Sequence, residues 1–463
     1  MTVVSGRQVR TEFFRHFLMA TIGQLRVVRC PGCKKHVAGT AADWARVWQC
    51  PLCGRQFRRR RGLFQASITS TDADRAGLAG QPQDAGDATN VRQPFSRRSR
   101  LEALGLGVYA ALLVLLMVLY HGVMAALAAV SLVLSAPIVL WRALALDAEP
   151  ETDEPRHASW LKPIADWFPR LWSGDADLTI GPVLTGDQAP GIFGIVAETA
   201  RMVGAPEPDE IRVTHVPCCG VLEQRRWCGL RRGRRVLVVG LPVLYVLTIE
   251  ELRAAVAHEL AHLSGGDAAM AFVISQFVDS LDQSIARGSA TRWRWVNPCV
   301  LFARIVRWLF SVLASPLSRH QEYRADRVAA SACGSDVVAR SLGLVALVQP
   351  VFKEVLCHYH PTVVPGVNLY QFFFAAWTAL DAQQKCAMRD SLVAEERPHW
   401  FDPHPSLRLR LANLEQYPAS AERDGRPALE ILTDRHELET RLHNQLYRAR
   451  TQPVSVFHPC GSY

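Results

Sequence analysis

The chain has 463 residues, of which 49% are hydrophobic and 21% are charged, and its formal net charge is +9. This apolar composition excludes an intrinsically disordered protein, and a mean hydropathy of +0.05 excludes a protein that is buried wholly in the membrane. The excess positive charge gathers in the first hundred residues, so it does not indicate a general nucleic-acid-binding surface. Residues 1–20 lack a continuous apolar core and a small-residue cleavage site, so we expect no cleaved secretory signal and reduced thiols.

Two paired-cysteine motifs come first, Cys30-Pro-Gly-Cys33 and Cys50-Pro-Leu-Cys53, with sixteen residues between them. Each motif presents two thiolates on one turn, and together they complete a tetrahedral Zn²⁺ site with Zn–S bonds of about 2.3 Å. A site with four protein ligands has no open position, so this zinc is structural. Residues 1–61 are therefore predicted to form a β-rich zinc ribbon. The alternative, a pair of redox dithiols, requires a thioredoxin-like βαβ context that the sequence lacks.

A basic run, Arg58–Arg61, follows the ribbon motifs, and Trp44, Trp48 and Phe57 lie near it. Such a run suits contact with nucleic acid or with acidic lipid. We favour a basic flank on a protein-docking module beside the membrane, and we do not expect nucleic acid as a partner. Residues 62–100 are rich in small and polar residues and are predicted to be a flexible linker.

Residues 101–146 are nearly uncharged and contain two apolar stretches, Leu101–Tyr120 and Val123–Trp141, which flank His121-Gly122. Each stretch has the length of about 20 residues that a membrane-spanning helix needs. We predict a transmembrane helical hairpin over 101–146, with its turn at His121-Gly122. The alternative is a buried helix pair of a globular domain, but neither stretch has a polar face.

Arginine placement predicts the orientation of this hairpin. Arg92, Arg97, Arg98 and Arg100 precede it and Arg142 follows it, whereas the turn has no Lys or Arg. The positive-inside rule then places both ends in the cytoplasm. The zinc ribbon and everything after a second linker, 147–174, are therefore expected on the cytoplasmic side.

The most informative motif is His258-Glu259-Leu-Ala-His262. Thr248 and Glu251 have the spacing of a capping box, so a helix is expected to begin there. Residues four apart share a face of a helix, so His258 and His262 can bind one Zn²⁺ while Glu259 acts on a bound water. The bare motif also occurs by chance, so its context must decide.

That context is a second acidic pair, Glu322 and Asp326, again four residues apart on a predicted helix. A carboxylate from Glu322 would complete a His₂Glu site that leaves the fourth position open for water. Asp326, one turn later, can accept the spare N–H of a ligating histidine and so fix its tautomer. By itself Glu322 would be interpreted as a solvated surface acid.

These motifs resemble those of membrane zinc metallopeptidases of the HtpX and CAAX-prenyl-protease type, which are gluzincins. The resemblance covers about Leu178–Leu414 and rests on Leu252–Asp267, on Ser318–Asp326 and on His404-Pro405-Ser406-Leu407 followed by Arg410. It implies a mainly α (α+β) zincin-type domain with a small sheet at 175–415. Beyond it, His436–Arg450 predicts an amphipathic helix in a C-terminal extension, 416–463, that packs on the domain or on a partner.

The resemblance also implies residue roles. His258, His262 and Glu322 would bind zinc, with Glu259 as general base. Asp326, Asp267 and Arg410 would support these residues, and His404 would stabilise the oxyanion in catalysis. His404 lies between two prolines, so an ordinary loop residue is the alternative.

The chain departs from the family at the stretch before the motif. Family members have an Asn-Ala element on the strand that lines the substrate cleft, where this chain has Val216-Pro217-Cys218-Cys219-Gly220, followed by the arginine-rich Arg225–Arg235. Specificity is therefore not transferred from the family. His215, Cys218, Cys219 and Cys228 suggest a further metal cluster, but adjacent cysteines chelate poorly.

Residues 268–317 separate the two motifs and include two apolar parts, Ala268–Leu281 and Trp295–Leu317. Because His262 and Glu322 must meet, this insertion crosses the membrane twice or not at all. Arg304 and Arg307 favour interfacial helices or a shallow re-entrant hairpin.

Together these features predict a membrane-anchored zinc endopeptidase, with one catalytic and one structural Zn²⁺, that cleaves membrane or misfolded proteins through a zinc-bound water activated by Glu259. Its expected partners are the lipid bilayer and protein substrates, and Ile211–Val216 and Arg235–Gly240 are candidate strands for substrate pairing. One alternative is a site-two-type intramembrane protease, which Glu250 and Arg253 in the motif helix disfavour. The other is an inactive membrane adaptor whose zinc ribbon recruits protein or nucleic acid.

Overall fold

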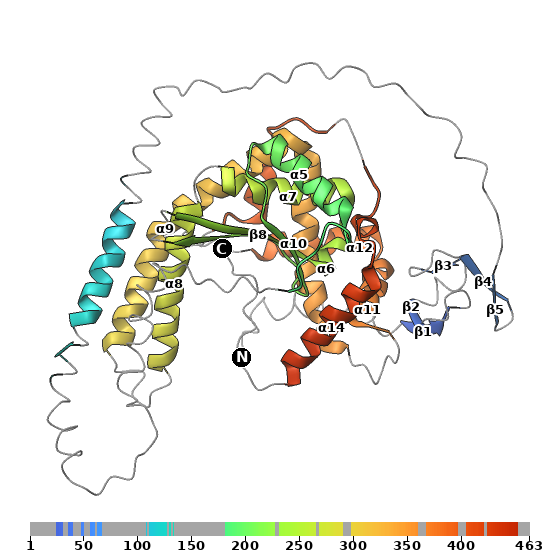
Figure 1. Cartoon of the computed structure of the whole chain (residues 1–463), viewed down its shortest axis with the longest axis horizontal. Helices are drawn as coiled ribbons and strands as arrows, with labels where there is room; N and C mark the ends of the chain where they lie inside the picture. The colour runs from blue at the N-terminus through green and yellow to red at the C-terminus, as the bar shows by residue number, and fades with distance from the viewer. Residues whose placement is uncertain are drawn as a thin grey trace, which may run out of the picture.

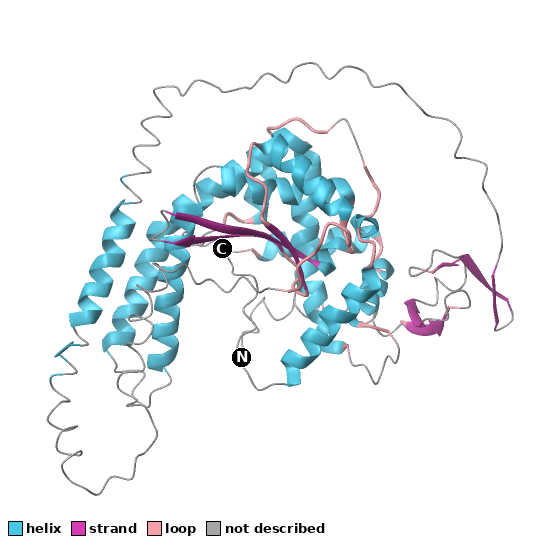
Figure 2. Ribbon diagram, viewed as in Figure 1, coloured by secondary structure: helices cyan, strands magenta, loops and turns pink. Residues whose placement is uncertain are grey.

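The computed structural model describes residues 25–30, 36–39, 48–50, 56–60, 63–66, 108, 111–126, 129–130, 133, 181–226, 231–264, 268–289, 298–359, 367–396, 404–420 and 424–451. Helices dominate these residues, and the strands form small sheets (Figures 1 and 2). The predicted mainly helical fold with a small sheet is confirmed.

The N-terminal strands form two small antiparallel sheets. β1 (Arg26–Arg29) pairs with β2 (His36–Gly39), and β3 (Trp48–Gln49), β4 (Gln56–Arg60) and β5 (Leu63–Ala66) pair in that order. Cys30 and Cys50 are both buried. Cys33 and Cys53 lie outside the described residues, so the zinc ribbon stays a prediction.

The sheet of the main domain contains β6 (Glu210–Thr214), β7 (Cys219–Arg226) and β8 (Arg231–Gly240) in the order β6-β8-β7. β8 is the central strand, parallel to β6 and antiparallel to β7. Its residues Val236 to Val239 are buried because the sheet is covered on both faces.

This order overturns the two candidate strands for substrate pairing. Arg235–Gly240 belongs to β8, whose two edges are both paired. Ile211–Val216 overlaps β6, whose outer edge bonds the preceding segment through Leu184 N–H to Ile211 C=O at 2.8 Å and Val213 N–H to Pro182 C=O at 3.1 Å. Within the described part of the chain, the edge of β7 that faces away from β8 pairs with no strand.

Helices lie above the sheet and at both of its ends in the view of Figure 1. They are α5 (Pro190–Val203), α6 (Leu241–Leu244), α7 (Ile249–Ser264), α8 (Ala268–Ser289), α9 (Pro298–Cys333), α10 (Ser335–His358), α11 (Leu369–Ala379), α12 (Ala382–Glu395), α13 (Leu407–Leu414), the 3₁₀ turn η1 (Ala428–Ile431) and α14 (Arg435–Thr451). The helix that contains the two motif histidines is α7, which packs against α5, α9 and α10.

The start of α7 confirms the predicted capping box. Thr248 N–H donates to Glu251 Oε2 at 2.9 Å, and Glu251 N–H donates to Thr248 Oγ1 at 3.3 Å. The two residues thus satisfy each other's otherwise unpaired donors at the helix N-terminus.

The junction between α9 and α10 lies at Gly334. Its φ is 92°, and a Cβ at this position would lie 2.4 Å from Ser420 N.

A separate helical layer extends from this domain. The helix Ala111–Ala126, α8 and the first half of α9 lie side by side at the left of Figure 1. They share an apolar cluster to which the first helix contributes Leu113, Met117, Tyr120 and Met124 from one face. We call these three segments the helical bundle.

The bundle corrects the predicted turn at His121-Gly122. Both residues lie inside the helix Ala111–Ala126, and His121 packs its ring against Tyr120 and Phe277. His121 Nδ1 bonds the C=O of Met117 one turn earlier at 2.7 Å, so a polar ring is accommodated without a break in the helix. The second half of the predicted hairpin lies largely outside the described residues.

The bundle exposes many large apolar side chains, together with an ion pair between Arg307 and Asp282. Large exposed side chains include Leu112, Leu115, Leu119, Leu301, Ile305 and Trp308. By length and composition α9 and α10 pass as membrane-spanning helices, and Ala111–Ala126 is a shorter apolar helix. α10 owes its hydropathy to the domain core, where Val348, Val351 and Val355 are buried.

Candidate metal and catalytic site

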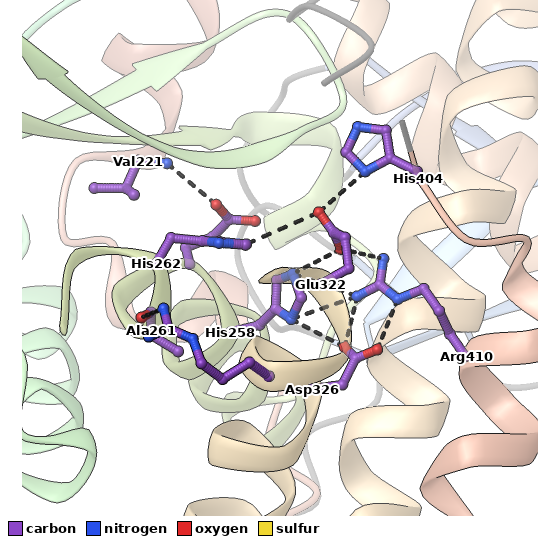
Figure 3. Close-up of polar contacts among 10 residues, drawn as sticks. Val221, His258, Ala261, His262, Glu322, Asp326, His404 and Arg410 are labelled. Atoms are coloured by element: carbon purple, nitrogen blue, oxygen red, sulfur yellow. Dashed lines mark hydrogen bonds and ion pairs between the residues drawn. The ribbon is translucent and has the colours of Figure 1, made fainter. Parts of the chain in front are cut away.

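The candidate metal ligands come from two helices that pack against each other. α7 supplies His258 and His262, and α9 supplies Glu322 (Figure 3). One ligand atom from each of the three residues lies within 4.8 Å of the other two. The nearest pairs are His258 Nε2 to Glu322 Oε2 at 3.5 Å and His262 Nε2 to Glu322 Oε1 at 3.9 Å.

This donor set fits a zinc ion. The Oε2 atom of Glu322 is buried and accepts no hydrogen bond, although the Arg410 guanidinium lies 3.1 Å away. A buried carboxylate oxygen without a donor is costly, and a cation between Glu322 and the imidazoles would satisfy it. Two imidazoles and one carboxylate are also the ligands of a catalytic zinc, with one position left open.

Asp326 lies behind His258, one turn along α9 from Glu322. Its carboxylate is fully buried, and its Oδ1 lies 3.0 Å from His258 Nδ1. An ionised carboxylate only accepts hydrogen bonds, so Nδ1 must donate. The lone pair of His258 is therefore on Nε2, which faces Glu322.

Arg410 of α13 connects the two carboxylates. Its Nε and Nη2 atoms donate to the two oxygens of Asp326 at 2.8 and 2.6 Å, and its Nη1 lies 3.1 Å from Glu322 Oε2. A bidentate pair of this kind fixes the position of both groups. The guanidinium thus compensates two acids that lie in a buried site.

The protonation of this cluster follows from burial and charge. Burial and the neighbouring His258 lower the pKa of His262 to about 3. Burial and Arg410 oppose the charged form of His258, but the carboxylates of Asp326 and Glu322 outweigh them and raise its pKa to about 9. A metal ion that binds Nε2 would therefore have to displace a proton from that nitrogen. Burial opposes ionisation of Glu322 and Asp326 as well, yet their hydrogen bonds to His258 and the charge of Arg410 lower the pKa of both.

Glu259 lies beside the ligand cluster, on the side that faces the sheet. Its Oε2 accepts a hydrogen bond from the backbone N–H of Val221 in β7 at 3.3 Å. Burial raises the pKa of Glu259 above its ordinary value. A carboxylate with a raised pKa beside the ligand cluster is suited to take and return a proton.

His404 lies at the opposite border of the cluster. Its Nδ1 lies 3.0 Å from Glu322 Oε1, and its side chain is 37% exposed. Figure 3 shows the second ring nitrogen pointing away from Glu322. The structure thus brings His258, His262, Glu322, Asp326, Glu259, His404 and Arg410 together.

The remaining site predictions have a different outcome. Asp267 lies outside the described residues, as do Cys33, Cys53 and Cys228. Among the residues that the structure describes, His258, His262 and Glu322 are the only group of three or more potential metal ligands. The alternative cluster around His215 is therefore not found there.

The sequence did not point to two contacts. The Val221 N–H is a backbone donor, which no side-chain motif can indicate. Arg324 donates from Nη2 to the C=O of Ala261 at 3.2 Å and so bridges α9 to the last turn of α7, beside His262. In the sequence, Arg324 lies between Glu322 and Asp326, and this position could have indicated that Arg324 belongs to the site.

Comparison with known proteins agrees with this geometry. Residues 227–418 match the family model "Peptidase family M48". The chain is 29% identical over 168 residues to "Protease HtpX" of Haemophilus influenzae (strain PittEE), which covers 33% of this chain and 57% of the relative. It is 25% identical over 175 residues to "Protease HtpX" of Enterobacter sp. (strain 638), covering 34% and 58%.

A third relative, "Protease HtpX homolog 2" of Methanosarcina mazei, is 27% identical over 257 residues, which are 53% of this chain and 77% of the relative. The match spans little more than half the length of the first two relatives. The predicted resemblance is confirmed, and residues 1–61, where the zinc ribbon is predicted, lie outside the family match.

Proposed function

We propose that this chain, an HtpX-like member of peptidase family M48, is a membrane-anchored zinc endopeptidase. The observation that carries the proposal is the convergence of His258 and His262 from α7 with Glu322 from α9, within 4.8 Å of one another. Glu259 lies beside these ligands, on the side of the sheet.

Zinc, when bound, polarises the scissile carbonyl and lowers the pKa of the attacking water. Glu259 accepts the proton of that water and then delivers it to the leaving amine. Asp326 keeps the proton on His258 Nδ1, and Arg410 holds Asp326 in place. His404, fixed by Glu322 through one ring nitrogen, presents the other to the developing oxyanion.

The substrate backbone is proposed to pair with the outer edge of β7, which faces away from β8. The Val221 N–H that bonds Glu259 marks this edge as the one beside the catalytic carboxylate. An extended peptide that adds a strand there would pass its scissile bond between Glu259 and the metal ligands. Pairing with a backbone edge places few demands on side chains, as suits a protease of misfolded proteins.

The helical bundle is proposed to lie in the membrane. Because α8 and α9 lie side by side with Ala111–Ala126, their orientation favours two crossings by the 268–317 insertion rather than interfacial helices. α9 has 36 residues, about 54 Å at 1.5 Å per residue, and runs from the bundle through Pro316 to Glu322. This continuity would keep the site next to the bilayer and favours membrane proteins as substrates. The arginines that precede residue 101 favour a cytoplasmic position for the domain.

The zinc ribbon is proposed to bind a second, structural Zn²⁺ and to dock proteins. Burial of Cys30 and Cys50 supports this role. The intramembrane protease is disfavoured because α7 lies in the domain core and its first-turn Glu250 forms an ion pair with Arg340 at 2.7 Å.

The test is chelator-sensitive cleavage of an unfolded protein by the purified chain in detergent. Glu259→Gln keeps the shape of the side chain, so it should retain zinc while turnover falls by several orders of magnitude. Proteolysis that Glu259→Gln and a chelator both leave intact would overturn the assignment. Zinc binding without any cleavage by the unaltered chain would favour the inactive adaptor.

A further inference from the structure

The C-terminal extension forms a continuous contact with the segment that leads into α7. Arg426 C=O accepts from Ile249 N–H at 2.8 Å, and Ala428 N–H donates to Leu247 C=O at 2.9 Å. These bonds flank an antiparallel bridge between Thr248 and Pro427. The segment just before the metal-binding helix is therefore paired with a strand-like stretch more than 170 residues away.

A side-chain contact reinforces this pairing. Glu250, in the first turn of α7, accepts a hydrogen bond from Asp424 N–H at 3.1 Å and pairs with Arg340 at 2.7 Å. Beyond η1, Thr433 N–H donates to Gln188 C=O at 3.1 Å, just before α5. The extension is thus bonded to two elements of the domain.

α14 then packs one face on the domain. Leu438, Leu442 and Leu446 recur at spacing four and belong to the main apolar cluster. Beside this apolar stripe lies Glu439, whose side chain has no exposed surface. A buried carboxylate is costly unless it is fully hydrogen-bonded.

Glu439 meets that requirement through donors from three elements. Its Oε1 accepts from the Tyr245 hydroxyl at the end of α6 and lies 3.1 Å from Arg435 Nε. Its Oε2 accepts from Asn368 Nδ2 at 2.7 Å and from Gln371 Nε2 at 3.1 Å. Asn368 also caps α11, since its Oδ1 accepts from Gln371 N–H at 2.9 Å.

Tyr245 connects Glu439 to the segment that leads into the metal-binding helix α7. Burial and the charge of Glu439 hold the pKa of Tyr245 well above its ordinary value, so the hydroxyl keeps its proton and donates. Tyr245 ends the α6 turn, three residues before the α7 cap at Thr248. A hydrogen bond to α14 thus holds the end of α6, and hydrogen bonds to residues 424–428 hold the segment that follows α6.

We propose that residues 424–446, which lie beyond the family match, are a brace that positions the metal-binding helix, with Glu439 as its key positioning residue. The brace fixes the start of α7, and α7 in turn fixes the direction in which His258 and His262 project. Its hydrogen bonds described above reach the start of α7, the end of α6 and α11, so it is expected to act on the metal centre rather than on the substrate edge. This inference rests on the proposed function for its zinc and activity readouts, whereas amide exchange tests it independently.

The test uses three variants of the full chain. Glu439→Gln keeps the size but removes the charge that four donors face, and Tyr245→Phe removes one hydroxyl. Glu437→Gln is the matched control, because Glu437 is exposed on the same helix two residues away. We expect Glu439→Gln to weaken zinc retention against a chelator and to lower kcat at least about tenfold with little change in KM, whereas Glu437→Gln matches the unaltered chain.

Amide exchange gives a readout that needs no activity. Exchange of residues 246–252 should accelerate in Glu439→Gln and, to a smaller extent, in Tyr245→Phe, while β7 stays protected. If Glu439→Gln does not fold, Tyr245→Phe decides through the same measurements. Unchanged zinc retention and exchange in the folded variants would overturn the brace, whether or not the chain cleaves peptides.

Discussion

Asp326 Oδ1 lies 3.0 Å from His258 Nδ1, and this contact assigns the proton of the imidazole to the side away from the metal position. Without it, the neutral ring would be free to adopt the tautomer whose N–H points at the metal. Arg410 holds Asp326 from behind with two hydrogen bonds. The orientation of one ligand therefore depends on residues from three helices.

Replacing Asp326 by Asn should lower zinc affinity by about 10- to 100-fold, because the amide cannot enforce the same tautomer. Competition with a chromogenic chelator measures this change. Asp390→Asn is the control, since Asp390 is exposed on α12. Equal affinities in the two variants would contradict the role of Asp326.

Replacing Val221 by Pro should reduce kcat/KM at least about tenfold, because it removes the backbone N–H on the outer edge of β7 that bonds Glu259. Val221→Ala keeps that N–H and should retain most of the activity. Cleavage of a short unstructured peptide measures both variants. If both lose activity equally, the backbone donor is not responsible.

The pH profile should follow the raised pKa of Glu259. A general base works when deprotonated, so kcat/KM should fall as the pH drops through the pKa of this group, which burial places above the ordinary 4.5. The Val221 N–H favours the charged carboxylate, so Val221→Pro should shift the acid limb to higher pH than Val221→Ala. An acid limb below pH 4.5 would contradict this.

Replacing Leu115 by Arg should impair membrane integration, because this side chain is 63% exposed on the outer face of the bundle. An arginine near the middle of a spanning helix costs about 2.5 to 3.5 kcal/mol. Leu409→Arg is the matched control, since Leu409 is 47% exposed on α13 of the domain. The fraction of protein that resists alkaline extraction from membranes should fall for the first variant only.

Local pattern predicted the elements of the site and their chemistry. His258 and His262 share a face because a helix repeats every 3.6 residues, and the Thr248–Glu251 pair caps that helix through contacts three residues apart. Glu322 and Asp326 followed from the same spacing, with the family resemblance supporting their roles. These features depend on neighbours along the chain, so the sequence alone determined them.

Contacts between distant segments decided the rest. The sequence favoured β6 and β8 for substrate pairing. The order of the strands depends on contacts between distant segments, and in the observed order β6 and β7 pair with the two edges of β8. A turn at His121-Gly122 looked favourable because polar and flexible residues break isolated helices, yet packing against Phe277 keeps the helix intact. The sequence predicted an amphipathic helix around Glu439 but not the burial of this carboxylate, because three of its donors, Tyr245, Asn368 and Gln371, come from distant segments that only the folded chain brings to it.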